Sequence, residues 1–172
     1  MNDIKLMNHA ADNIRILAAS MVEKAKSGHP GGAMGGADFV NVLYAEYLQY
    51  DPENPTWEGR DRFFLDPGHM SPMLYSQLAL AGKFTIDELK EFRQWGSPTP
   101  GHPEVDFTRG IENSSGPLGQ GHVYAVGAAI AANSWLLVQV IRLSQRKPSM
   151  LISQTVVFKK KYHKAQVVLQ VT

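Results

Sequence analysis

Three histidines stand in loops rich in glycine and proline, and their residue types suit proton transfer. They are His29 in SGHPG, His69 in DPGH and His102 in PGHP. Glycine lets the backbone approach a ligand closely, and proline fixes the loop that aims the imidazole. An imidazole titrates near neutral pH and can donate or accept a proton. We therefore expect one shared site. Zinc binding there remains an alternative, although no two of these histidines have helical or tight-loop metal spacing.

A fourth stretch, GPLGQG at residues 116–121, enters a predicted helix from a glycine-rich turn. Such a turn points backbone N–H groups and the positive end of a helix at an anion, commonly a phosphate. The stretch lacks the GK[ST] ending of a P-loop and the GxGxxG spacing of a dinucleotide site. By itself it also fits a turn that serves only packing.

Amphipathic helices joined by glycine-rich loops are expected to position these residues. The spacing of apolar residues and the capping signals predict helices over residues 7–26, 38–48, 71–81, 85–95 and 122–132. Gly82 is expected to close the third of these helices, and Thr85 with Glu88 to cap the fourth. The sequence predicts one short buried strand in DRFFLDPGH, and irregular loops in SGHPGGAMGGAD and GSPTPGHPEVDF. This order suggests the opening part of an α/β domain that lacks most of its sheet.

Composition sets few limits on function. The chain has 172 residues, 44% of them hydrophobic, a formal charge of +1 and no cysteine. Disulfides and thiolate chemistry are therefore excluded, and no strong overall field points to nucleic acid. No signal peptide is visible at the start, and no apolar run approaches the length of a membrane span. These features predict a cytoplasmic protein without a membrane partner.

The composition changes abruptly at Asn133. All 15 glycines and all 16 acidic residues lie before it, together with ten of the 17 Lys and Arg residues, so residues 1–132 carry −6. Residues 133–172 hold the other seven Lys and Arg and carry +7. Two compositions are joined at one point.

The four glycine-rich stretches together resemble the transketolase family, whose members use thiamine diphosphate to move two-carbon ketol units between sugar phosphates. The resemblance runs from about Asn8 to Ala132, through KAKSGHPGGAMGGAD, NPTWEGRDRFFLDPGH, TPGHPE and GIENSSGPLGQGHVYAVGAAIA in the family's order. It implies an α/β fold class, an incomplete thiamine-diphosphate-binding fold with a parallel sheet flanked by helices. Residues 1–132 would form the N-terminal part of the cofactor domain, the diphosphate-binding one.

The resemblance also implies a role for each histidine. His29 and His102 match catalytic, substrate-binding histidines that contact sugar oxygens near the bond being cut or made. His69 matches a cofactor-binding histidine beside the diphosphate and the reactive ring. The carbanion chemistry itself belongs to the cofactor.

Gly116, Pro117 and Leu118 match the family's loop that lies against thiamine diphosphate. The resemblance further implies Mg²⁺, sugar phosphates as substrates and a homodimer partner, with no nucleic acid. In the family, an Asp-Gly motif on a later strand supplies an Asp ligand for Mg²⁺, and a later Asn supplies another. Residues 133–172 contain no Asp or Glu, so no metal ligand is assigned in this sequence.

The family's missing motif is legible when the tail is read one base out of frame. Residues 149–153, SMLIS, permit YAYIS, and the codons of Gln154 through Val157 permit Asp-Gly-Gly. The lysine run 159–161 then permits Glu-Glu. We infer a single-base frameshift near Asn133, which makes residues 133–172 an aberrant tail without native domain structure.

The chain alone is expected to be inactive. The magnesium ligands and the family's pyrimidine-binding domain are absent, and the family's site is built between two subunits. Another thiamine-diphosphate enzyme remains an alternative, either dihydroxyacetone synthase or deoxyxylulose phosphate synthase, although TPGHPE and GIENSSGPLGQG favour transketolase over the latter. A non-enzymatic module with a basic tail is the alternative from another class; it would bind nucleic acid in a salt-dependent way, and lose that binding without residues 133–172.

Overall fold

The computed structural model describes residues 2–146, with side chains described through Ser134. The chain divides into two units, Met1–Gly121 and His122–Thr172. The elements in chain order are α1 (Ile4–Ala25), α2 (Pro30–Gly35), α3 (Ala37–Val42), the π-helix η1 (Leu43–Tyr47), the 3₁₀ turn η2 (Gly68–Met70), α4 (Ser71–Leu80), α5 (Ile86–Lys90) and α6 (Gln120–Arg146).

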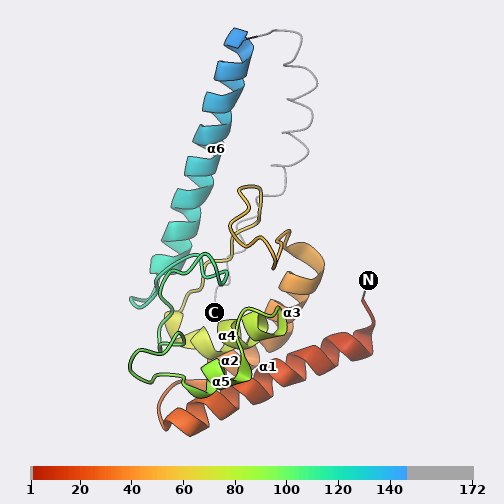
Figure 1. Ribbon diagram of the computed structural model, residues 1–172, viewed down its shortest axis with the longest axis vertical. Helices are drawn as coiled ribbons and strands as arrows, with labels where there is room; N and C mark the ends of the chain where they lie inside the picture. Colours follow the sequence, from red (N-terminus) through yellow and green to blue (C-terminus); the bar gives the residue numbers. More distant parts are fainter. Residues whose placement is uncertain (1, 147–172) are drawn as a thin grey trace. The chain divides into compact units, whose positions relative to one another are not determined.

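Helix α1 forms the base of the first unit, and α2, α4 and α5 pack along it (Figure 1). Its buried stripe consists of Ala11, Ile14, Ala18 and Met21, at the spacing of one helical face. At its start, Asp3 accepts a hydrogen bond from the Lys5 amide at 3.0 Å. The helix predicted for residues 7–26 is confirmed and begins three residues earlier.

Helix α4 is the centre of the core. Eight of its ten residues are buried, and α1, α2, α3 and α5 all contact it. Tyr75, Leu74 and Met73 are fully enclosed together with Phe92 and Leu89. Since a helix that is apolar all round must be covered on every side, α4 is the framework to which the neighbouring loops attach.

The stretch SGHPGGAMGGAD, residues 27–38, was expected to be a loop, and this prediction is wrong from Pro30 onward, because Pro30–Gly35 form α2 and Ala37 begins α3. Pro30 stands at the first helical position, where its fixed φ favours a helix and its missing N–H costs nothing. The glycines bring α2 close to methionines, since an added Cβ at Gly36 would lie 2.5 Å from Met73 Sδ. Packing against the core therefore outweighs the low helix propensity of glycine.

The other helices agree with the sequence in position but not always in length. The helix predicted for residues 38–48 is formed by α3 and η1, and the Thr85–Glu88 capping box is present. Gly82 has the expected positive φ of 77° after α4. The helix expected to reach Trp95 ends at Lys90, because the chain turns there into Arg93, whose φ is 62°.

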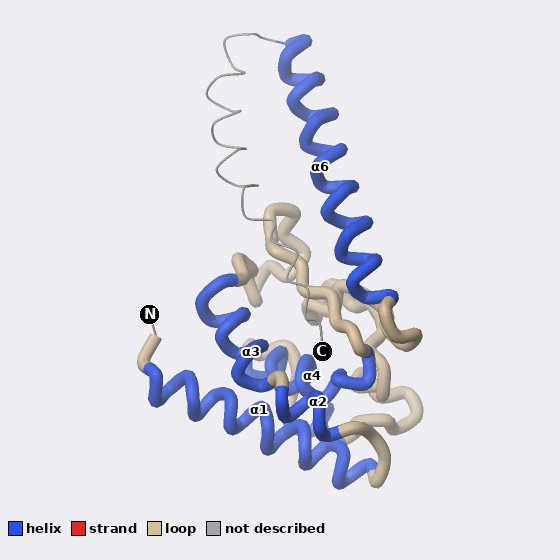
Figure 2. The backbone as a smooth tube through the Cα atoms, turned by 180° about the vertical axis from the view of Figure 1, so that it is seen from behind, coloured by secondary structure: helices blue, strands red, loops and turns tan. Residues whose placement is uncertain are grey.

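The short strand predicted in DRFFLDPGH is not formed among the described residues, which contain only an isolated bridge between Asp106 and Ile111 (Figure 2). The Leu65 amide donates to Asn113 Oδ1 at 3.0 Å, and Asn113 Nδ2 donates to the Leu65 carbonyl at 3.3 Å. A side-chain amide thus satisfies the backbone where a neighbouring strand would bond.

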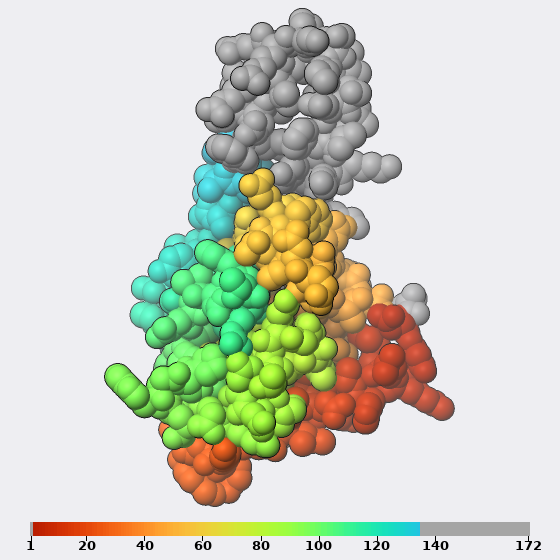
Figure 3. Space-filling model, in the orientation of Figure 1, coloured from red at the N-terminus to blue at the C-terminus, as the bar shows by residue number. Residues whose placement is uncertain are grey.

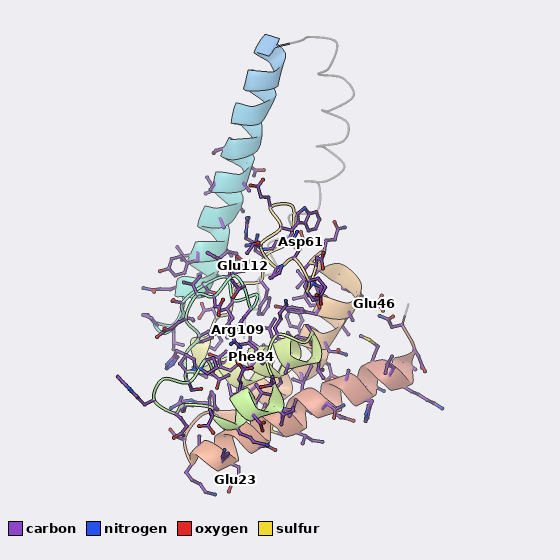
Figure 4. The ribbon with its side chains drawn as sticks, viewed as in Figure 1. Glu23, Glu46, Asp61, Phe84, Arg109 and Glu112 are labelled. Atoms are coloured by element: carbon purple, nitrogen blue, oxygen red, sulfur yellow. The ribbon has the colours of Figure 1, made fainter. Side chains whose placement is uncertain are left out.

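Ion pairs hold the long loops of this unit. Arg60 and Glu112 form a two-pronged pair at 2.7 and 3.1 Å, and their side chains are only 9% and 5% exposed. The segments that carry them, gold and green in Figure 3, lie side by side. Arg109 lies over the Phe84 ring at 4.8 Å and pairs with Glu88 at 2.8 Å (Figure 4). These contacts fix residues 104–113 against α5 and the loop that follows η1.

The helix expected after the glycine turn is confirmed as α6, which begins at Gln120 and runs through the composition change at Asn133 to Arg146. A membrane-crossing helix is not found in the part of the chain that the structure describes. Residues 149–161, whose codons the frameshift prediction uses, lie outside the described residues.

Candidate functional site

Two of the three predicted histidines meet. The rings of His29 and His69 have centroids 4.7 Å apart, with their planes tilted by 46°. His29 is the residue immediately before α2 and is exposed, whereas His69 lies within η2 and is half-buried. Since η2 runs directly into α4, the His69 imidazole lies at the edge of the core, and the exposed His29 ring lies next to it.

The loop that carries His102 is tied to the same end of α4. Ser71 Oγ donates to the Gly101 carbonyl at 2.7 Å, and Tyr75 Oη donates to the Pro100 carbonyl at 2.9 Å. Ser71 follows His69 by only two residues, so one helical turn holds both histidine segments. His102 itself is exposed.

The electrostatics of His69 reflect this grouping. Burial lowers its pKa, the nearby charges of His29 and His102 lower it further, and the Asp66 carboxylate acts in the opposite direction. The neutral imidazole is thereby favoured. A neutral ring can accept a proton or donate a hydrogen bond, as a group at a proton-transfer site must.

The glycine-rich turn lies beside the same segment. The Gly119 amide donates to Asp66 Oδ1 at 3.2 Å, and the Ser115 amide donates to the Pro103 carbonyl at 2.9 Å. Residues 115–119 therefore contact both the chain before His69 and the chain after His102. Within this turn Gly116 is half-buried, and Pro117 and Leu118 are exposed, the latter at 72%.

Backbones approach each other here more closely than any side chain would allow. A Cβ added to Gly121 would lie 2.5 Å from Asp66 Cβ and 2.6 Å from the Leu65 carbonyl oxygen. One added to Gly68 would lie 2.6 Å from Ser115 Oγ. These two glycines are required by close approach, which the sequence motif alone could not distinguish from flexibility.

The structure brings the six predicted residues to one locality. His29, His69 and His102 come from three loops around the start of α4, and residues 116–118 lie on a turn bonded to Asp66 and Pro103. Among residues 2–146, no three His, Cys, Asp or Glu side chains are grouped so as to hold a metal ion, so the zinc alternative has no support there.

Sequence reasoning missed several residues that shape this locality, namely Asp66, Arg93, Asn113 and Ser115. Ser115 Oγ is buried without a hydrogen-bond partner among the described residues. Its position next to GPLG was the only signal available. Arg93 and Asn113 act through contacts distant in sequence, which no local pattern reveals.

A separate shallow pocket lies elsewhere in this unit and is lined by Tyr44, Tyr50, Phe63 and Arg60, among others. None of the six predicted site residues lines it. The chemistry-bearing residues therefore lie outside this pocket, in the loops around the start of α4.

Three histidines thus lie near a glycine turn at the entry to a long helix, and comparison with known proteins identifies the class of domain that has this arrangement. The family model "Transketolase, thiamine diphosphate binding domain" matches residues 6–139. The chain belongs to this family, and the resemblance drawn from its motifs is confirmed.

The relatives are transketolases from distant organisms. The chain is 53% identical over 131 residues to Transketolase-1, chloroplastic, of Arabidopsis thaliana, and 54% identical over 122 residues to Transketolase 1 of Escherichia coli K12. These matches cover 75% and 70% of this chain and 18% of each relative.

Solved structures agree. The transketolase from Campylobacter jejuni superimposes with a TM-score of 0.71 at 46% identity over 76% of this chain, and that from Leishmania mexicana with 0.70 at 49% over 73%. The match covers 21% and 19% of those chains, so this chain spans about a fifth of the length of its relatives.

Proposed function

We propose that this chain is the N-terminal part of a transketolase, in which the whole protein transfers a two-carbon ketol unit between sugar phosphates with thiamine diphosphate and Mg²⁺. The observation that carries the proposal is the meeting of His29 and His69 at 4.7 Å beside a loop fixed by the Gly119–Asp66 hydrogen bond. Family membership supports the same activity. The chain alone is inactive in this proposal, since it spans a fifth of the relatives' length.

The residues present fit the diphosphate end of the cofactor. Ser115 Oγ is buried and unpartnered among the described residues, and Gly116 presents backbone where an added Cβ would meet no described atom within 4 Å. We assign Gly116, Pro117 and Leu118 with His69 to the cofactor, and His29 and His102 to the sugar substrate. When bound, thiamine diphosphate would supply the carbanion chemistry of its thiazolium ring.

The chain's own histidines orient the substrate and handle protons. His69 is kept neutral by burial and by its histidine neighbours, so it can donate a hydrogen bond without adding a full positive charge. His29 and His102 are exposed and therefore accessible to a substrate's hydroxyl or carbonyl oxygens. Their imidazoles would exchange protons with those oxygens as the carbon–carbon bond is made or cut.

The remaining parts of the site belong to the chain beyond Asn133 in its restored frame. We propose that this continuation supplies the parallel sheet against which the helices of the first unit pack, and the Asp and Asn ligands of Mg²⁺. The homodimer partner and a cytoplasmic location are part of the same proposal. No nucleic-acid or membrane partner is proposed.

The first test is to sequence the source DNA across the codon of Asn133 and to express the gene in both frames. The restored-frame protein should bind thiamine diphosphate with Mg²⁺ and form a new ketose phosphate from a ketose phosphate donor and an aldose phosphate acceptor. The 172-residue chain should bind neither thiamine diphosphate nor Mg²⁺. Cofactor binding by the short chain would contradict the assignment of the metal ligands to the restored frame, and a restored protein that transfers no ketol unit would contradict the proposed activity.

A further inference from the structure

Arg93 occupies a backbone conformation that its residue type does not favour. Its φ is 62°, in the left-handed region where glycine and asparagine are at home. The conformation is held by the Arg93 amide, which donates to the Thr99 carbonyl at 3.0 Å. A strained arginine at such a turn is a reason to ask what its side chain does.

The Arg93 guanidinium lies between two of the histidine loops. Nη1 donates to Ser27 Oγ at 3.0 Å, two residues before His29. On the other side the group packs flat on Gly101, where an added Cβ would lie 2.7 Å from Nε and 2.9 Å from Cζ. Gly101 directly precedes His102, so one side chain contacts both histidine-bearing segments.

The Phe92 ring supports both the His29 loop and the Arg93 side chain. Gly28, next to His29, lies over Phe92, with an added Cβ placed 3.4 Å from that ring. The Arg93 guanidinium carbon lies 5.6 Å from the centroid of the same ring. Phe92 is almost completely buried and cannot move without disturbing the core.

The Arg93 guanidinium is not part of an ion pair among the described residues. Within residues 2–146 no carboxylate lies within ion-pair distance of it, and its Nε is buried without a hydrogen-bond partner. A lysine would supply the charge but not the flat group that fills the space between Ser27 and Gly101. Shape and donor geometry therefore account for this residue better than charge does.

We propose that Arg93 is a positioning residue for ketol transfer, which sets the separation of His29 and His102 by bonding to Ser27 and packing on Gly101. The proposal rests on the function proposed above. It makes Arg93 specific to the substrate side of the site, because neither Ser115 nor residues 116–121 contact it in any hydrogen bond or glycine packing found in the structure.

The test uses the restored-frame protein with Arg93→Met, which keeps an aliphatic stem over Phe92 and removes the guanidinium. We expect kcat/KM for ketol transfer to fall about 10-fold or more, because small displacements of reacting groups are costly. The Kd for thiamine diphosphate with Mg²⁺ should stay within about 2-fold of the parent, an effect below about 0.5 kcal/mol. Arg15→Met is the matched control, since Arg15 lies on α1, pairs with Asp12 of the same helix and with Asp38 of α3, and contacts none of the histidine loops.

Two further variants keep the test decisive. Ser27→Ala removes the acceptor of the guanidinium, so its effect should be non-additive with Arg93→Met in a double-mutant cycle. Arg93→Gly relieves the positive φ, and should lose activity while Tm stays at or near that of the parent. Equal losses of cofactor affinity and activity, additive effects with Ser27→Ala, or an unchanged kcat/KM would each overturn the proposal.

A parent protein that transfers no ketol unit would contradict the proposed function and leave the positioning role open to a direct structural readout. Hydrogen exchange then decides it: Arg93→Met should speed exchange in residues 27–30 and 99–103, and leave residues 113–121 unchanged. Uniform or absent changes would overturn the positioning role.

Discussion

The histidine site is held in two different ways. On the glycine-packed side, formed by residues 65–69 with 113–121, segments approach so closely that no Cβ fits: Gly121 lies against the Leu65 backbone, and Gly68 lies against Ser115. On the hydroxyl-anchored side, residues 99–103, side chains of Ser71 and Tyr75 hold loop carbonyls at 2.7 and 2.9 Å. The first arrangement is rigid because close-packed backbone has nowhere to move, while the second depends on single hydrogen bonds that can be removed one at a time.

The difference fits the division of labour proposed for the site. A cofactor that stays bound through many turnovers is served by backbone groups in fixed positions. A substrate that enters and leaves would be served by His102, which lies on a loop held by single hydrogen bonds. Substitutions on the glycine-packed side should therefore lower stability strongly, whereas those on the hydroxyl-anchored side should each have a small effect.

The largest effect is expected from Gly121→Ala. Its new Cβ would lie 2.6 Å from the Leu65 carbonyl oxygen and 2.5 Å from Asp66 Cβ, and neither belongs to the far end of a flexible side chain. Overpacking against backbone should cost about 3 kcal/mol or more, measured by urea unfolding of the chain. Gly35→Ala is the control, because an added Cβ there meets no described atom within 4 Å. Similar losses for both variants would contradict the idea of a close-packed side.

The second-largest effect is expected at the ion pair between Arg60 and Glu112, the residue just before the glycine-packed segment 113–121. Arg60→Met should leave Glu112, 5% exposed, with only the weaker contact to Arg62 at 3.7 Å. An uncompensated buried charge should lower the free energy of unfolding by about 3 kcal/mol. The double variant Arg60→Met, Glu112→Met should recover much of that loss. Lys90→Met, which breaks the exposed pair with Asp87, is the control and should leave the free energy of unfolding almost unchanged.

Local signals predicted the helices, and the same signals misjudged what packing decides. The periodicity of Ile14, Ala18 and Met21 was enough for α1, and the Thr85–Glu88 box was enough for the start of α5. Residues 30–35 form a helix that packs through Gly32 against Met70, and the next residue, Gly36, packs against Met73; both are contacts between distant segments. The backbone at Leu65 bonds to Asn113, 48 positions away, so no pattern around residue 65 could show it.

The site followed the same rule. Glycine and proline beside His29, His69 and His102 pointed to one locality, because each residue type has a local reason to stand in a ligand-facing loop. Arg93 has no such local signature. Its partners, Ser27 and Gly101, lie on separate loops, and only the fold brings them to the two faces of one guanidinium.

A smaller, graded effect is expected on the hydroxyl-anchored side. Tyr75→Phe removes the bond to the Pro100 carbonyl while keeping the buried ring, and should cost about 1 kcal/mol. Hydrogen exchange should speed up in residues 99–103. Ser76→Ala is the control, because Ser76 is equally buried but donates to Pro72 within α4 at 2.7 Å. If Ser76→Ala loosened the same loop as much as Tyr75→Phe, anchoring by individual hydroxyls would be wrong.

The smallest effect is a pH dependence at the junction of the two sides. Burial lowers the pKa of His69, and His29 and His102 lower it further, so the unfolded chain takes up a proton at this residue at a higher pH than the folded chain does. Stability from His69 is therefore complete above the ordinary histidine pKa and is lost as pH falls through that value toward the folded one. His69→Gln should flatten this part of the profile in urea unfolding between about pH 7.5 and about pH 5.5. Asp66→Asn should steepen it, since the amide keeps an acceptor for the Gly119 N–H but removes the charge that opposes the shift. The same pH slope in the parent and in His69→Gln would contradict the lowered pKa of His69, and with it the burial of this residue beside His29 and His102.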